Sequence, residues 1–141
     1  MLAARQQEQY LELSCDIAEL EKIKECIFQI AGSQEVPFVC KTDQEIRKKI
    51  YLVCEEIFVN IVSYSGADHA QFCCSRDADK IRVVFTDNGK TFNPLESRPE
   101  KDFEDFDEGG MGIMLVKELC SAISYSSTDG KNILRMEFTE N

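Results

Sequence analysis

Two long segments in the first half of the chain place apolar residues at helical spacing. Within residues 16–31, and again within residues 46–64, every third or fourth position is apolar. Thr42 and Glu45 have the spacing of a capping box ahead of the second segment, and Gly66 follows it as a stop signal. The pattern therefore predicts two amphipathic helices, the second beginning near Thr42.

The remaining apolar runs are short or alternate with polar residues, which is typical of strands. Turn sequences separate them, among them Asp129-Gly130 before the last run. A third helical pattern occupies residues 112–119. The strands expected from these runs are residues 9–14, 70–75, 80–86, 122–127 and 133–139.

Residues 87–108 carry no sustained periodicity and are rich in acidic side chains. A segment of this length without its own helix or strand is typical of a functional loop in a compact domain. The order of elements predicts an α+β fold, a two-layer sandwich with helices on one face of a mainly antiparallel sheet. Nothing in the sequence divides the chain, so residues 1–141 are expected to form a single domain.

Composition narrows the class of protein. The formal net charge of −10 opposes nonspecific binding to nucleic acid or to anionic membranes, so neither partner is expected. Seven cysteines without disulfide or zinc spacing indicate free thiols in a reducing compartment. No secretory signal or long apolar run is present, and we expect a cytoplasmic protein.

Glu56 and Asn60 are four residues apart on the second predicted helix. That spacing brings a carboxylate and an amide together on one helical face, where both can reach one ligand. An amide oxygen suits Mg²⁺, and a nearby carboxylate can accept the proton of an attacking hydroxyl. Glu55 points about 100° away around the helix and is the poorer candidate for this base. Alternatively, Glu56 and Asn60 are two polar residues on the wet side of an amphipathic helix.

Asp87 follows the apolar run 81–86 and precedes Asn88-Gly89. A carboxylate at the end of a buried strand can accept a hydrogen bond from an exocyclic amine, which would select adenine over guanine. Glycine at position 89 permits close approach of the backbone. The alternative interpretation is an ordinary turn, since Asp-Asn-Gly is a common turn sequence.

Gly109-Gly110-Met111-Gly112 directly precedes the third helical pattern. A glycine loop at a helix start exposes free N–H groups, which together with the helix dipole favour phosphate. The spacing matches neither a Walker A loop nor a dinucleotide fingerprint. A glycine hinge without a ligand is the alternative.

Taken together and in this order, the three motifs resemble the nucleotide site of the GHKL ATPase superfamily. Glu56 with Asn60 is similar to its N box, Asp87 to Phe92 to its D-x-G-x-x-F box, and Gly110-Met111-Gly112 to its second glycine box. Asn93-Pro94-Leu95 and the length of the chain resemble the bacterial anti-sigma-factor serine/threonine kinases.

The resemblance implies ATP and Mg²⁺ as cofactors and a role for each matched residue. Glu56 would be the general base, Asn60 the Mg²⁺ ligand and Asp87 the adenine reader. The acidic loop before Gly109 would be the ATP lid. The other nucleotide contacts that the resemblance implies are Gly89, Phe92, Gly110, Met111 and Gly112.

The chain departs from the resembling family at two places. Tyr64 stands where many of these kinases have histidine, one turn after the asparagine. Near the last predicted strand, where a threonine often approaches adenine, the chain has Lys131-Asn132-Ile133.

The function implied is that of an ATP-dependent serine/threonine protein kinase. Its substrate would be a small anti-sigma-factor antagonist, a sigma factor would be a further partner, and the kinase would form a homodimer. A nucleotide-gated binding module without kinase activity is a second hypothesis. A third is a detached histidine-kinase catalytic domain, which would need an upstream helical hairpin carrying the acceptor histidine.

Overall fold

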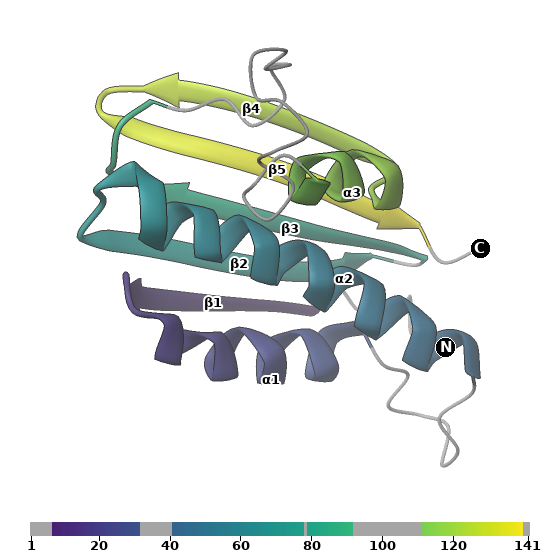
Figure 1. The fold of residues 1–141 in the computed structure, drawn as a ribbon. Coiled ribbons are helices and arrows are strands. Elements are labelled where there is room, and N and C mark those ends of the chain that lie inside the picture. Colours follow the sequence, from purple (N-terminus) through teal and green to yellow (C-terminus); the bar gives the residue numbers. More distant parts are fainter. Residues whose placement is uncertain (1–6, 32–40, 78, 92–110, 140–141) are drawn as a thin grey trace.

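A five-stranded antiparallel sheet forms one layer of the molecule, and the described helices form the other (Figure 1). The computed structural model describes residues 7–31, 41–77, 79–91 and 111–139. Figure 1 shows α1, α2 and α3 on the same side of the sheet. The expected α+β two-layer sandwich is therefore confirmed.

The strands and helices follow one another in the predicted order, and their ends differ from the predicted ends by a few residues. The strands are β1 (Gln7–Ser14), β2 (His69–Asp77), β3 (Lys80–Asp87), β4 (Ala122–Thr128) and β5 (Lys131–Thr139). The helical elements are a 3₁₀ turn η1 (Ile17–Glu19), α1 (Leu20–Ala31), α2 (Lys41–Asn60), a π-helical turn η2 (Ile61–Ser65) and α3 (Met111–Leu119).

The strand order is β1-β2-β3-β5-β4, so the last strand of the chain lies between β3 and β4. The pairing of β3 with β5 sets Asp87 opposite Asn132. β4 and β5 join through Asp129 and Gly130, which both have positive φ, 54° and 74°. This two-residue turn with positive φ at both positions has the twist that an antiparallel hairpin needs.

Alternate residues of the central strands face the helices and are buried, as period-two patterning requires. Phe85 of β3 lies at the centre of this core. Its ring centroid is 6.4 Å from that of Phe58 on α2 and 5.1 Å from that of Phe72 on β2. These contacts hold α2 against the middle of the sheet.

Three details differ from the expectations. The first turn of the first helix is a 3₁₀ turn, capped by Asp16, whose carboxylate accepts from the Ala18 N–H. The capping-box prediction is wrong, because α2 begins at Lys41 and Thr42 lies inside it. The last turn of the second predicted helix is π-helical, and it ends as expected at Gly66, where φ is 72°.

Candidate functional site

A pocket opens between the helical layer and the sheet, near the end of β3. Its apolar lining comes from Ile57 and Ile61 on the helical side and from Phe85 and Leu134 on the sheet. The pocket encloses about 40 Å³. Its polar lining includes Asn60 and Asp87, so two of the three predicted motifs contribute side chains to the same pocket.

Asn60 lies in the last turn of α2 and is 9% exposed. The half-buried carboxylate of Glu56 lies one turn earlier on the same helix, within reach of the Asn60 amide. Burial, followed by the charge of neighbouring Glu55, raises the pKa of Glu56, and the hydrogen bond from Asn60 partly offsets this. An oxygen atom is the ligand type that a hard cation prefers, so the Asn60 carbonyl oxygen is the atom of this side chain suited to a cation.

Asp87 is the last residue of β3, and its carboxylate is oriented by two donors. Oδ1 accepts from the Gly89 N–H at 2.8 Å and from the Asn132 amide nitrogen at 3.0 Å. The Gly89 contact is the side-chain-to-backbone bond of an Asx turn. Asp87 therefore forms a turn and also lines the pocket, so its interpretation as a turn residue is compatible with its interpretation as a ligand-binding residue.

The turn after Asp87 is attached to the end of the helix that carries Asn60. The Lys90 N–H donates to the Ser65 carbonyl at 2.7 Å. Ser65 is itself held in η2, because its hydroxyl donates to the Ile61 carbonyl at 2.6 Å. The adenine-reader and metal-ligand candidates thus lie on segments that are hydrogen-bonded to each other.

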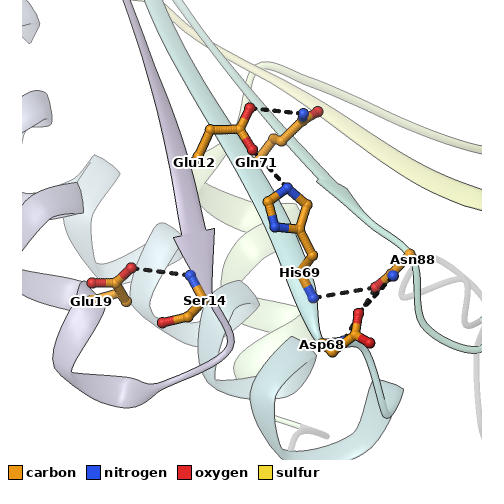
Figure 2. A network of polar contacts seen from close by, with 7 residues as sticks. All are labelled: Glu12, Ser14, Glu19, Asp68, His69, Gln71 and Asn88. Atoms are coloured by element: carbon orange, nitrogen blue, oxygen red, sulfur yellow. Dashed lines mark hydrogen bonds and ion pairs between the residues drawn. The ribbon is translucent and has the colours of Figure 1, made fainter.

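Asn88, in the same turn, is hydrogen-bonded to Asp68 and His69, as Figure 2 shows. Its amide nitrogen donates to the Asp68 carboxylate at 2.8 Å, and its oxygen accepts from the N–H groups of Asp68 and His69 at 3.2 and 3.3 Å. The His69 ring in turn lies 2.6 Å from Glu12 of β1. The Asp-Asn-Gly turn is therefore tied to the connection between η2 and β2.

A match with a protein-family model decides the family. Residues 30–138 match the model described as "Histidine kinase-like ATPase domain". This chain belongs to the histidine kinase-like ATPase family. The GHKL superfamily that the motifs resemble is thereby confirmed, and the pocket of this histidine kinase-like ATPase domain is a candidate site for ATP.

Solved structures of two histidine kinases have a similar fold. The blue-light activated histidine kinase of Erythrobacter litoralis EL346 has a TM-score of 0.54 at 18% identity, over 87% of this chain and 41% of that one. The Acinetobacter baumannii histidine kinase AdeS has a TM-score of 0.52 at 18% identity, over 94% of this chain and 68% of that one. The ATPase domain thus spans less than half of the light-activated kinase. A search of curated proteins found no match.

The glycine motif contributes the beginning of a helix to this ATPase domain. Met111 and Gly112 are the first two residues of α3, which packs beside α2. Predicted contacts Phe92 and Gly110 lie outside the described residues. Among the helices that the structure describes, none is long and apolar enough to cross a membrane.

Two buried polar residues that line the pocket of the histidine kinase-like ATPase domain were not predicted as site residues. Ser65 is buried and contacts the turn after Asp87, and Asn132 is 4% exposed and contacts Asp87 itself. The signal for Asn132 was its place in Lys131-Asn132-Ile133, where the sequence departs from the pattern of the kinases that it resembles. That signal marked the position without showing what the asparagine contacts.

Proposed function

We propose that this chain binds ATP with Mg²⁺ in the pocket and transfers the γ-phosphoryl group to a serine or threonine of a small anti-sigma-factor antagonist. One observation carries the proposal. Asn60 of α2, one helical turn after Glu56, and the oriented carboxylate of Asp87 from β3 line one pocket in a histidine kinase-like ATPase domain.

The pocket suits the amino edge of adenine. Its apolar walls can contact a planar base, and the Asp87 carboxylate can accept from the exocyclic amine. A volume of about 40 Å³ corresponds to about three water molecules. We therefore propose that the pocket receives the edge of the base, with the sugar and phosphates toward its open side.

Asn60 supplies an oxygen atom of the kind that a hard cation prefers. Mg²⁺ commonly uses only one or two protein ligands when it also binds nucleotide phosphates, so the Asn60 carbonyl fits that role. When bound, the ion would neutralise phosphate charge. Asn60 would then place its ligand oxygen and, through its amide nitrogen, keep the Glu56 carboxylate beside the reacting groups.

Glu56 would act as the general base. The acceptor hydroxyl loses its proton to the Glu56 carboxylate as its oxygen bonds to the γ-phosphorus, and the bond to the β-γ bridging oxygen breaks to release ADP. A raised pKa suits this role, because a base is most effective when its pKa approaches the working pH.

A histidine-kinase catalytic domain is a second candidate, and the fold likeness to two histidine kinases favours it equally. The acceptor would then be a histidine on another segment or chain. A nucleotide-gated binding module remains a third candidate, in which ATP would change the affinity for a partner without phosphoryl transfer.

Transfer of labelled phosphate separates these functions. The purified chain is incubated with γ-labelled ATP, Mg²⁺ and the small proteins encoded beside its gene. An acid-stable label on one of them supports serine/threonine kinase activity, whereas an acid-labile label indicates phosphohistidine. No label despite ATP binding supports the gated module. Glu56→Ala should abolish the label while ATP binding persists.

We also propose the setting in which this kinase acts. The partners would be the antagonist protein and a sigma factor, and the chain would be a single domain, acting as a homodimer in the cytoplasm. The acidic net charge of −10 supports association with basic protein segments through charge complementarity. Sedimentation of the purified chain, alone and with a candidate antagonist, would measure both assemblies.

A further inference from the structure

We infer that Asn132 positions Asp87 and sets the selectivity of the pocket for a base that carries an amino group. The inference rests on the proposed ATP site and concerns how that site reads the base. Asn132 lies on β5, opposite Asp87 in the register of the sheet, and it lines the pocket. At 4% exposure its amide is among the few buried polar groups of the described chain.

The orientation of the Asn132 amide follows from its neighbours. On one side, the Asp87 carboxylate and the carbonyls of Gly89 and Lys90 each lie 3.0 Å from Nδ2. All three groups only accept hydrogen bonds, so the nitrogen must face them, and its two hydrogens serve the three acceptors.

The carbonyl end of the same amide is held by β4. The Asn132 Oδ1 accepts from the Tyr125 hydroxyl at 3.1 Å and from the Ser127 hydroxyl at 2.9 Å. Hydroxyl groups can donate, so they complement the oxygen and oppose rotation of the amide. Asn132 therefore links the edge strand to the turn that carries Asp87.

This arrangement presents one oxygen of Asp87 to the base. Gly89 and Asn132 both donate to Oδ1, which leaves Oδ2 as the oxygen that can accept from a ligand. A fixed carboxylate oxygen favours an amino group and repels an oxo group at the same position of a purine. Without Asn132, the carboxylate can rotate away from an oxo group, and discrimination falls because preorganisation is lost.

Binding of ADP and IDP tests this inference, because the two bases differ at the amino position that Asp87 is proposed to read. The full chain and its Asn132→Ala variant are titrated with each nucleotide in the presence of Mg²⁺ by calorimetry. We expect ADP affinity to fall about tenfold, as for the loss of a hydrogen bond to a charged group. IDP affinity should change little, so the preference for ADP shrinks.

Two further variants make the result interpretable. Arg135→Ala alters an exposed residue of the same strand and should preserve both affinities. Tyr125→Phe retains the ring but removes the hydroxyl that holds Asn132, and a reduction of a few fold in ADP preference is expected. Tyr125→Phe also tests the inference if Asn132→Ala fails to fold.

The outcomes separate this inference from the proposed function. Equal losses for ADP and IDP would mean that Asn132 only supports the fold, and an unchanged preference in both pocket variants would overturn its role. If the unmodified chain binds neither nucleotide, the proposed ATP site itself is wrong.

Discussion

Gly89 and Ser65 approach so closely that a side chain on Gly89 has no room. A Cβ atom at Gly89 would lie 2.5 Å from the Ser65 carbonyl oxygen and 2.6 Å from its hydroxyl. The carbonyl belongs to the backbone and also accepts from the Lys90 N–H. Glycine at this position therefore allows the turn after Asp87 to pack directly against η2, the helical turn that follows α2.

Gly89→Ala is predicted to separate these two segments. Overpacking of this kind costs about 1–3 kcal/mol of unfolding free energy, measurable by chemical denaturation. ATP affinity should fall as well, because the turn carries Asp87.

Gly130→Ala is the matched control for that variant. Gly130 lies in the β4-β5 turn with φ of +74°, and no atom of the described residues lies within 4 Å of the place that a Cβ would take. The variant should lose about 1–2 kcal/mol from backbone strain alone, with ATP affinity unchanged. Wild-type stability and affinity in Gly89→Ala would contradict the steric argument.

Glu56→Gln is predicted to remove the base while keeping the shape of the side chain. Phosphoryl transfer should fall at least about 100-fold, the lower range for loss of a general base, with nucleotide binding retained. In the wild type, the transfer rate should rise with pH through the raised pKa of Glu56, since the ionised carboxylate accepts the proton. Glu55→Gln is the control and should retain transfer.

Stability should respond to the same substitution in a pH-dependent way. The pKa of Glu56 is raised by folding, so the folded state binds this proton more strongly than the unfolded state. Its contribution is fully present below the unfolded pKa of about 4.3 and is lost as pH rises through the folded pKa. Glu56→Gln should therefore melt at a higher temperature than wild type at pH 7, with the difference shrinking toward pH 4.

Asn60→Ala is predicted to weaken the effect of Mg²⁺ on nucleotide affinity. In the wild type, removal of Mg²⁺ by a chelator should lower ATP affinity. In the variant, the ratio of the affinities with and without Mg²⁺ should be smaller by about tenfold or more, as for loss of a contact to a charged group. Calorimetry with and without Mg²⁺ measures both. Ser63→Ala, an exposed residue of the adjoining turn, is the control. A full Mg²⁺ effect in Asn60→Ala would exclude Asn60 as the ligand.

Asn88→Ala is predicted to loosen the connection between η2 and β2. The amide hydrogens of Asp68 and His69 lose their acceptor, so both should exchange faster with solvent. The cost in stability should be about 1 kcal/mol, the usual net value of such bonds. Gln71→Ala breaks only a side-chain contact to Glu12 and should leave these two amides protected. Unchanged exchange in Asn88→Ala would show that the turn is held by other contacts.

Local patterns in the chain were sufficient for most of the secondary structure. The alternation in residues 80–86 predicted β3, and Asp129-Gly130 predicted the turn that joins β4 to β5. Periodicity and turn chemistry act over a few residues, so they can be recognised without knowledge of the fold. The capping box at Thr42 failed because a spacing alone does not show where a helix begins.

The pairing of distant segments could not be recognised in that way. The position of β5 between β3 and β4 follows from contacts across the sheet, and nothing in the periodicity of residues 133–139 names a partner strand. The π-helical turn that places Ser65 beside the Asp87 turn also has no distinctive local pattern.

The residues of the candidate site also differ in whether local sequence was sufficient to predict them. Glu56, Asn60 and Asp87 were predicted as site residues from the sequence, because each belongs to a motif whose residue types suit one chemistry, and Asn60 and Asp87 line the pocket. Asn132 required the fold, since an asparagine in a strand has no fixed role of its own. A side-chain amide acts through the groups placed around it, and here folding brings it to an aspartate 45 positions earlier in the chain.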